Sequence, residues 1–392
     1  MSSPTKYFIG IDFGSKFTRA AVLVESAESV KLFDIIELPL YENFNNSSER
    51  YKAGFLDVSN YLKARKIILK SAVTNLDNRF IKSIPHVVEI KNRIPFNSLP
   101  RSLLRYARRR AMSPNIAPDE KIVDQYLGNL SIDGKKTIDQ MARTGSKLRQ
   151  DSISIVTKTS DYVELINASH DTGVYIEDVV PSNLTHTYLT DKLNLTPKEF
   201  SLFIDVGSRM TKTCFFNQER VLAVENFEVG GEDVTNMIVE ELDLVYEEAE
   251  KLKVSPVFKF IMEKNNSDKK NNRLAHRLTN ENYVLLQLIS HYASNYGMDL
   301  SNMKNIILAG GGSSLAGFQE LIINFYQKPC EIVGDKSYKY FLNYRIKPEI
   351  SCAVGLAYAS YLKRKEKVRD RSLTGVISTY FANSIENLLF TD

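Results

Sequence analysis

The stretch YFIGIDFGSKFTRAAVLV, residues 7–24, decides the fold of this chain. Its two ends, residues 7–11 and 18–24, are apolar runs typical of β-strands, and turn-forming residues lie between them. In such a turn Gly14 allows the backbone to approach an anion, and successive N–H groups form a concave set of donors. The carboxylate of Asp12 is suited to a hydrated Mg²⁺ ion. This stretch alone is compatible both with a phosphate-binding turn and with an ordinary N-terminal hairpin.

The same pattern recurs in the second half of the chain. Residues 200–216, FSLFIDVGSRMTKTCFF, again form an apolar run, an Asp-x-Gly-Ser turn and a second apolar run. Aligning the turn at 205–208 on the turn at 12–15 gives an internal duplication. The repeat favours phosphate binding over an isolated hairpin.

A third stretch predicts a strand that runs into three consecutive glycines. It covers residues 305–321, NIILAGGGSSLAGFQEL. A glycine turn at a helix N-terminus suits a nucleotide phosphate or its ribose. Ser313 and Ser314 are expected to cap the helix that follows.

Three nucleotide-type turns in this order and at these intervals resemble the actin, Hsp70 and hexokinase superfamily over nearly the whole chain. The resemblance implies an α/β protein with a two-lobed actin/Hsp70-like ATPase fold that holds ATP and Mg²⁺ between its lobes. The two hairpin turns would bind the phosphates, and the glycine turn at 310–312 would face the adenosine.

The composition is that of a soluble globular protein. At 392 residues the chain can hold two or more domains, and its 43% hydrophobic and 25% charged residues are ordinary for such proteins. A net charge of +4 is too small to indicate nucleic acid as a partner. The three cysteines are widely spaced, which favours a reducing compartment over a disulfide framework or a zinc site. We expect neither a signal peptide nor a membrane span.

An α+β insertion is expected at residues 74–178. Its predicted elements are strands at 84–90 and 152–157, helices at 99–111 and 160–171, a helix end at Gly173 and a strand at 175–180. Before it, we expect a strand at 31–39, a polar loop at 41–49, a helix at 59–69 and a strand at 71–73.

The insertion sharpens the resemblance to FtsA, the bacterial actin homologue of the division machinery. FtsA-type proteins carry a small α+β subdomain, 1C, at this point. The residues that carry the similarity are Asp133-Gly134, Ile138, Gly145, Leu148 and the strand at 153–156. Residues 51–58 resemble the segment that precedes this subdomain. The pilus-assembly protein PilM is close kin with a similar layout and stays an alternative.

The FtsA resemblance implies an ATP-binding, actin-like cell division protein that polymerises at the inner face of the cytoplasmic membrane and tethers the ring of FtsZ, the tubulin homologue. It would be cytoplasmic and peripheral on the cell membrane at the septum. Its implied partners are FtsZ and other division proteins, further copies of itself in a filament, and an anionic membrane surface, but no nucleic acid. PilM would instead be an ATP-binding adaptor of type IV pilus assembly that binds the cytoplasmic tail of an inner-membrane pilus protein. A small-molecule kinase on the same fold is a third alternative, for which we find no acceptor loop with a catalytic Asp.

The resemblance also divides the chain into subdomains. They are 1A (1–73, 179–198 and 346–366), 1C (74–178), 2A (199–231 and 297–345), 2B (232–296), and a basic linker with an amphipathic helix (367–392).

The second half predicts a long helix at 234–253, a polar loop at 264–273, a helix at 280–296 and a helix at 349–362. Physically, the charges at the end of the first helix read as a solvated helix end with charge pairs. By resemblance to FtsA and PilM, Glu250 and Lys253 would instead reach the ribose and adenine.

The second phosphate turn departs from the superfamily, whose members often show Asp-x-Gly-Gly-Gly-Thr-Thr. Ser208, Arg209 and Met210 follow Gly207 here, and Arg209 either adds charge beside the phosphates or points away. The missing glycines crowd the approach to the γ-phosphate, and no residue is identified that positions the attacking water. We therefore expect ATP binding with weak or no hydrolysis, and the catalytic residues are unknown.

The candidate cofactor-binding residues come from the three turns and from the helix at 234–253. They are Asp12, Gly14, Ser15, Lys16, Asp205, Gly207, Ser208, Gly231, Glu250, Lys253, Gly310, Gly311, Gly312 and Ser313. Asp12 and Asp205 are expected to hold Mg²⁺ through water. The five histidines show no metal-binding spacing.

Five arginines lie within the predicted helix at 99–111, and they are Arg101, Arg105, Arg108, Arg109 and Arg110. They form either a solvated helix face or a contact for an acidic partner or anionic lipid.

The C-terminus predicts a membrane-targeting helix. A basic cluster at 363–371 precedes the amphipathic segment at 376–390. Its apolar face, at helical spacing, consists of Ile377, Tyr380, Phe381, Ile385, Leu388 and Leu389. The alternative is a final helix packed on the body of the protein.

Overall fold

The computed structural model describes residues 6–25, 30–40, 46–136, 144–189, 199–217, 220–262, 269–334 and 346–371, with side chains described up to residue 365. The expected membrane helix at 376–390 lies outside these residues. No helix in the described ranges is long and apolar enough to cross a membrane. All three cysteines are buried free thiols.

Two five-stranded sheets of identical topology form the two lobes. The first has the order β3-β2-β1-β4-β9 and consists of β1 (Tyr7–Phe13), β2 (Phe17–Glu25), β3 (Val30–Pro39), β4 (Ser71–Leu76) and β9 (Tyr175–Pro181). The second has the order β12-β11-β10-β13-β14 and consists of β10 (Phe200–Val206), β11 (Thr211–Phe216), β12 (Val221–Phe227), β13 (Met303–Ala309) and β14 (Cys330–Ile332). In each lobe an antiparallel meander continues into parallel strands, which confirms the predicted α/β class.

The duplication holds at the level of single residues. In the first hairpin Asp12 pairs with Arg19, and in the second Asp205 pairs with Lys212 at the equivalent position. Each turn closes with the same hydrogen bond. The Gly14 N–H donates to the Phe17 carbonyl at 3.0 Å, and the Gly207 N–H donates to the Met210 carbonyl at 2.9 Å. Residues directly opposite in an antiparallel pair point to the same face, so each Asp faces a cation.

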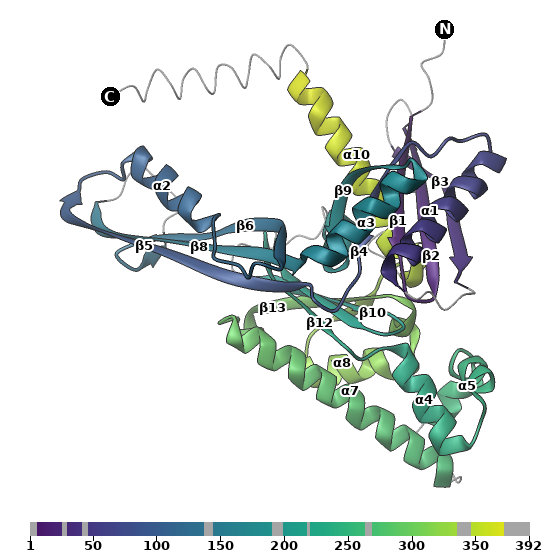
Figure 1. The fold of residues 1–392 in the computed structure, drawn as a ribbon. Helices are drawn as coiled ribbons and strands as arrows, with labels where there is room; N and C mark the ends of the chain where they lie inside the picture. Colours follow the sequence, from purple (N-terminus) through teal and green to yellow (C-terminus); the bar gives the residue numbers. More distant parts are fainter. Residues whose placement is uncertain are drawn as a thin grey trace.

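Helices cover both faces of the first sheet (Figure 1). On one face, α1 (Ser47–Ala64) packs on β1 through ring contacts with Phe13 and lies beside α3 (Thr159–Thr172). On the other face, α10 (Ser351–Arg371) crosses β1, β2 and β4. Gly173 ends α3 in the left-handed conformation, with φ of 70°, as predicted.

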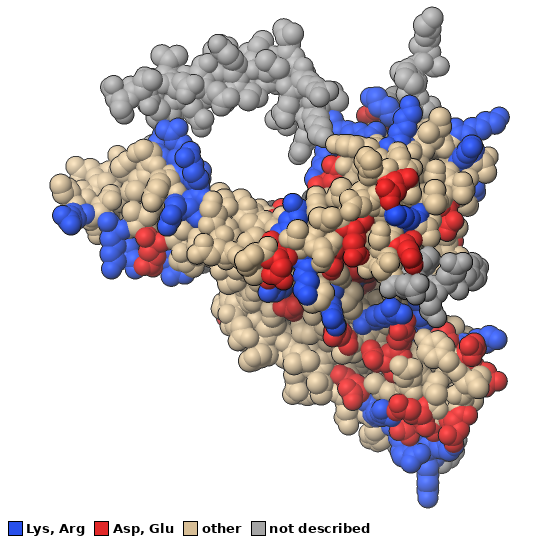
Figure 2. Space-filling view, in the orientation of Figure 1, with Lys and Arg blue, Asp and Glu red and all other residues tan. Residues whose placement is uncertain are grey.

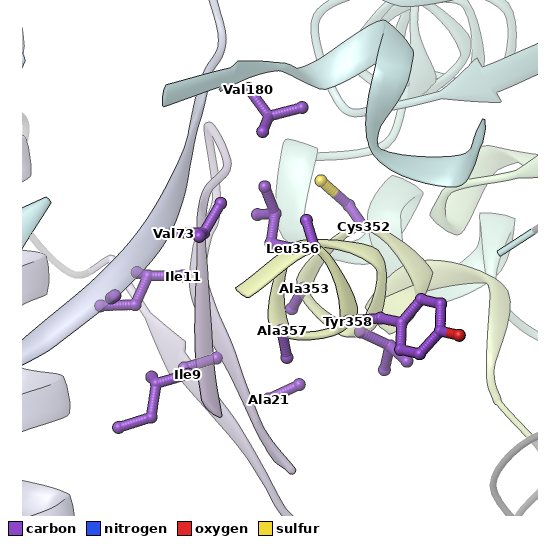
Figure 3. Close-up of a cluster of buried hydrophobic side chains, with 14 of the residues drawn as sticks. Ile9, Ile11, Ala21, Val73, Val180, Cys352, Ala353, Leu356, Ala357 and Tyr358 are labelled. Atoms are coloured by element: carbon purple, nitrogen blue, oxygen red, sulfur yellow. The ribbon is translucent and has the colours of Figure 1, made fainter. Parts of the chain in front are cut away.

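The contact between α10 and the first sheet is made by small residues (Figure 3). Ala353 and Ala357 are buried against the sheet, and Gly10 on β1 leaves room for them. The helix predicted at 349–362 is thus confirmed, although it begins at Ser351 and continues to Arg371.

The helix predicted at 59–69 is wrong in its bounds, because α1 begins at Ser47 and ends at Ala64. Asn46 caps it by accepting a hydrogen bond from the Glu49 N–H at 2.9 Å, so the end of the predicted loop at 41–49 is helical. Lys66 follows in the left-handed region, with φ of 61°, and ends the helical geometry.

The second lobe carries five helices in its described residues. They are α4 (Gly231–Leu242), α5 (Tyr246–Lys253), α6 (Val257–Met262), α7 (Lys269–Asn295) and α8 (Phe318–Tyr326). The single helix predicted at 234–253 is wrong, because Asp243 adopts φ of 55° and separates α4 from α5. The end of the loop predicted at 264–273 is also wrong, since α7 begins at Lys269.

The insertion forms a separate sheet that projects from the lobes (Figure 1). Its order is β5-β8-β6-β7, with β5 (Lys82–Phe96), β6 (Glu120–Ile132), β7 (Lys135–Lys136), β8 (Gly145–Lys158) and the helix α2 (Arg101–Ala111). Leu104 and Ala107 of α2 are buried, and Figure 2 shows Lys and Arg gathered over this helix. The flanking α3 and β9 pack with the first lobe.

Candidate functional site

A cavity of about 680 Å³ lies where the ends of β1 and β10 face each other across the two lobes. All fourteen candidate cofactor-binding residues line it. They are Asp12, Gly14, Ser15, Lys16, Asp205, Gly207, Ser208, Gly231, Glu250, Lys253, Gly310, Gly311, Gly312 and Ser313. Residues from three turns and two helices therefore form a single concave surface.

The glycine turn after β13 is held tightly against the second phosphate turn. Gly310 has φ of 77°, and a Cβ there would lie 2.2 Å from Asp205 Oδ1. Its N–H donates to the Pro348 carbonyl at 3.1 Å. Gly310 is therefore required by both conformation and close approach. Gly311, by contrast, has no other atom within 4 Å of its Cβ position.

The predicted serine cap of the next helix is wrong. Ser313 Oγ donates back to the Gly310 carbonyl at 2.7 Å, inside a short 3₁₀ turn over Gly311–Ser314. Helix α8 begins only at Phe318, after Gly317 in the left-handed conformation. The glycine turn thus closes on itself and not on the helix N-terminus.

Gly311 gives a direct test of ligand approach. We expect Gly311→Ala to leave the melting temperature unchanged, because the added methyl group meets no protein atom within 4 Å. In a nucleotide-binding cavity the same methyl group would weaken ATP binding by about tenfold, because it blocks close backbone approach. Isothermal titration calorimetry measures the affinity, and equal affinities would contradict this role.

Asp12 is the buried carboxylate that the first lobe supplies to the cavity. Its Oδ1 accepts a hydrogen bond from Asn75 Nδ2 at 2.6 Å, and Asn75 Oδ1 accepts from the Phe13 N–H at 2.7 Å. Burial raises the pKa of Asp12 to about 6, against the opposing effect of the charges on Lys212 and Arg19. Asn75, on β4, is the residue that holds this carboxylate in place.

Lys212 brings a buried positive charge into the cavity. Its Nζ lies 3.0 Å from Asp77 Oδ1 and 3.9 Å from Asp205 Oδ2, and its side chain is 8% exposed. Burial alone lowers the pKa of Lys212, but the carboxylates of Asp77, Asp205 and Asp12 outweigh it and hold the pKa above its usual range. Lys212 is therefore a permanent cation among three aspartates.

Helix α5 supplies a polar network at the opposite wall. Lys253 Nζ donates to the Gly231 carbonyl at 2.9 Å, to Thr235 Oγ1 at 2.8 Å and to Glu250 Oε2 at 2.7 Å. Burial raises the pKa of Glu250, but the hydrogen bonds from Lys253 and Thr235 lower it by more. The net result is a pKa below the usual value for glutamate. Glu250 is thus a fixed carboxylate that faces the cavity.

Lys16 connects the two lobes across the cavity. Its Nζ lies 3.4 Å from Glu250 Oε1 and donates to the Tyr246 hydroxyl at 3.2 Å. Burial lowers the pKa of Lys16, but the bond to Tyr246 and the charge of Glu250 together raise it above normal. The first phosphate turn is therefore linked to α5 by an ion pair.

The second phosphate turn packs on the start of α4. The N–H groups of Gly231 and Glu232 donate to the carbonyls of Gly207 and Ser208, at 3.0 and 2.7 Å. Ser208 Oγ and Arg209 Nε both donate to the Glu232 carboxylate, at 2.9 and 3.3 Å. The guanidinium of Arg209 is therefore paired with a carboxylate of the protein.

The side chains of the cavity fit a phosphate chain better than they fit a metal ion. Within the described residues, no group of three or more His, Cys, Asp or Glu side chains is placed to hold a metal. Asp12 and Asp205 both line the cavity, but the Lys212 ammonium lies beside Asp205. The Lys212 ammonium therefore lies beside one of the two carboxylates that are expected to hold Mg²⁺ through water.

Sequence reasoning missed Asn75, Asp77, Lys212 and Tyr246. A signal existed for Lys212, because it lies opposite Asp205 in the predicted hairpin and is the single charge in a strand of otherwise uncharged residues. Asn75 lies in strand β4, which neighbours β1, and Asp77 directly follows that strand. Tyr246 has no local signal.

Comparisons with known proteins match this architecture. The family described as "Cell division protein FtsA" matches residues 202–355, from β10 into α10. Two curated FtsA proteins from Staphylococcus epidermidis strains are each 25% identical over 183 residues, which is 46% of this chain. The alignment spans 34% of the length of those relatives.

Solved structures show the fold over almost the full length. A chain of a PilM-PilN type IV pilus biogenesis complex has a TM-score of 0.63 at 17% identity, covering 91% of this chain and 99% of that one. The ethanolamine utilization protein EutJ from Carboxydothermus hydrogenoformans has a TM-score of 0.51 at 12% identity, covering 91% of each chain. The predicted two-lobed fold is thereby confirmed.

Proposed function

We propose a function from the premise that this chain is an FtsA-related protein of the actin-like ATPase fold, with PilM as structural kin. It binds ATP in the cavity between its lobes and acts as an actin-like cell division scaffold. It polymerises at the inner face of the cytoplasmic membrane and tethers the FtsZ ring at the septum.

One observation carries the ATP-binding part of the proposal. The fourteen residues chosen from three separate sequence stretches all line one cavity of about 680 Å³, a size that suits a nucleotide. The turns at Gly14 and Gly207 bind the phosphates, because their backbones are duplicated in geometry and face each other. The adenosine then lies between the Gly310 turn and α5, where Glu250 accepts from a ribose hydroxyl.

A substitution at Glu250 tests whether this residue binds the nucleotide or only stabilises the fold. We expect Glu250→Gln to weaken ATP binding by about tenfold, because a hydrogen bond to a charged acceptor contributes about 1.5–3 kcal/mol and the neutral amide keeps part of it. Glu247→Gln is the matched control, because this exposed glutamate lies on the same helix. Calorimetry with ATP measures both, and equal affinities for the two variants would refute the assignment.

Filament formation and membrane attachment rest on the family relationship and on the C-terminal sequence. With ATP and an anionic lipid monolayer, electron micrographs should show single or double protofilaments. A filament presents many weak membrane contacts at once, which strengthens attachment. Protein that stays monomeric on the monolayer would remove the scaffold function while leaving the ATP site in place.

The C-terminal segment gives the sharpest test of the membrane role. We expect deletion of residues 376–392 to abolish flotation with anionic liposomes and to leave ATP binding intact, because the apolar face of the segment enters the interface. Phe381→Glu, on that apolar face, should also prevent flotation. Asn383→Glu adds the same charge to the polar face and should float. A truncated protein that floats would place the anchor elsewhere.

A second function is favoured by the structural likeness to the PilM-PilN complex, which covers 91% of this chain. In this alternative the chain binds ATP and captures the cytoplasmic tail of an inner-membrane pilus protein. Such an adaptor needs no filament. Pull-down with FtsZ against a pilus-protein cytoplasmic tail, each immobilised at equal density, distinguishes the two functions.

A further inference from the structure

The second hairpin carries a charge that nucleotide binding alone does not explain. Lys212 is opposite Asp205 in the β10–β11 pairing, and its side chain is 8% exposed. The Asp77 side chain beside it is 7% exposed, and both residues line the cavity. An ammonium group buried to this degree is retained only where carboxylates compensate for its lost hydration.

The equivalent cations of the two hairpins, Arg19 and Lys212, have different partners. Arg19, the equivalent of Lys212 in the first hairpin, points its Nε to Glu37 Oε2 at 2.6 Å and lies over the Phe17 ring. Its charge is therefore compensated within the first lobe. Lys212 instead turns toward the other lobe, where Asp77 at the end of β4 meets it at 3.0 Å. This ammonium joins the lobes at the point where the two phosphate turns face each other.

The position of the ammonium disfavours a hydrated divalent ion at these carboxylates. Mg²⁺ keeps six oxygen ligands at about 2.0–2.1 Å and retains several waters when few carboxylates hold it. The Lys212 Nζ lies 3.0 Å from Asp77 Oδ1 and 3.9 Å from Asp205 Oδ2, so a hydrated ion held by these carboxylates would have to share the space around them with the ammonium. Two cations this close also repel each other.

We propose that Lys212 is the resident cation of the site, so that the phosphates bind against its ammonium group and no divalent metal ion is needed. The ammonium bridges the Asp77 and Asp205 carboxylates to the phosphate chain, as a metal ion bridges carboxylates and phosphates elsewhere. The inference deepens the proposed function and rests on it, because it takes the ligand of the cavity to be a nucleotide.

The first measurement compares ATP affinity in Mg²⁺ with ATP affinity in EDTA. The wild-type protein should show affinities within about threefold of each other, because its cation is built in. Lys212→Met should lose more than about tenfold in EDTA and recover part of that loss in Mg²⁺. Lys63→Met, at an exposed position on α1, is the matched control and should behave as wild type.

Removal of Lys212 leaves two buried carboxylates without their cation, and the single variant is at risk of unfolding. The double variant Asp77→Asn/Lys212→Met also removes one of the two negative charges. It should fold with a cooperative thermal transition and show the same metal dependence of ATP binding. If this folded variant binds ATP equally well in EDTA and in Mg²⁺, Lys212 is not the cation.

A second measurement needs no nucleotide. Mn²⁺, followed by electron paramagnetic resonance, should find no tight site in the wild-type protein. It should bind one ion per chain in the double variant, at the Asp12 carboxylate and the Asp205 carboxylate that has lost its ammonium. A tight Mn²⁺ site in the wild-type protein would overturn the inference.

The two proposals fail in different ways. If wild-type protein binds ATP only with Mg²⁺, the resident-cation inference is refuted and the proposed function stands. If it binds no ATP under either condition, the proposed function is refuted. In that case the only remaining claim is that Lys212 takes the place of a metal ion. That claim requires Mn²⁺ binding by the double variant and none by the wild type.

Discussion

Gly10→Ala is expected to lower the free energy of unfolding by about 3 kcal/mol, at the upper end of the usual cost of overpacking a core. A Cβ at this position would lie 2.2 Å from the Ala357 nitrogen and 2.5 Å from the Ala353 carbonyl oxygen. Both atoms belong to the backbone of α10, so no side-chain rotation relieves the contact. The helix must move away from β1.

That movement affects more than one contact. Helix α10 buries Ala353, Leu356 and Ala357 against the first sheet (Figure 3), and all three are 1% exposed or less. A shift of the helix separates the whole row from the strands, and interiors packed this closely do not deform locally. Loss of stability is therefore expected without any direct change at the nucleotide cavity.

Urea denaturation followed by circular dichroism measures the effect. Gly311→Ala is the matched control, because it makes the same substitution at a glycine whose Cβ position meets no atom within 4 Å. A Gly10→Ala protein with the midpoint of the wild type would show that α10 does not need the close approach seen here.

Acidification is expected to destabilise the protein through His186. This residue is 1% exposed in the 3₁₀ segment Ser182–Leu189. Its ring stacks on Phe203 of the second lobe with centroids 4.0 Å apart, and its Nε2 lies 2.8 Å from Ser351 Oγ. Its Nδ1 lies 3.2 Å from Thr185 Oγ1, so both ring nitrogens contact hydroxyl groups. The neutral imidazole therefore joins both lobes and the start of α10.

Burial, assisted by the nearby charge of Lys212, lowers the pKa of His186 from 6.5 to about 3. In the unfolded chain the histidine takes up a proton below its ordinary pKa, while the folded protein keeps it neutral. Its contribution to stability is therefore complete above pH 6.5 and is lost progressively as the pH falls toward 3. Between pH 7 and pH 4, this single group lowers the free energy of unfolding by about 3 kcal/mol.

A comparison of His186→Asn with the wild type isolates the pH dependence of stability that comes from His186. The variant loses ring stacking at neutral pH, but its stability should fall less on acidification, by about 3 kcal/mol between pH 7 and pH 4. His291→Asn, at an exposed histidine, should follow the wild-type curve. Parallel curves for the wild type and His186→Asn would show that His186 titrates normally in the folded protein.

The sequence by itself determined the features that depend on neighbouring residues. The strand–turn–strand units at Asp12 and Asp205 were predictable because alternating apolar runs and glycine turns are local patterns, and their duplication is visible by alignment. Every candidate residue from these turns then reached the cavity, because hairpin register follows from the turn. The helix end at Gly173 was predictable for the same reason.

Helix boundaries were less secure because two local signals compete there. Asn46 caps α1 three residues before Glu49, a recognisable pattern that the polar loop composition concealed. Between α4 and α5 the charged pattern favours continuous helix, yet Asp243 turns left-handed. The break allows α5 to fold back, so that Lys253 reaches the Gly231 carbonyl. That contact stabilises the turned chain, and it exists only in the folded lobe.

Only the tertiary structure decided which charges meet. Asn75 holds Asp12 from 63 residues away, and Lys16 reaches Tyr246 from 230 residues away. The meeting of Lys212 with Asp77 depends on how the two lobes face each other, and no period or spacing along the chain encodes that. Electrostatic interactions act through space and depend on burial, whereas sequence patterns report only on neighbours along the chain. The nucleotide turns are therefore determined locally, and the cation between them is determined by the fold.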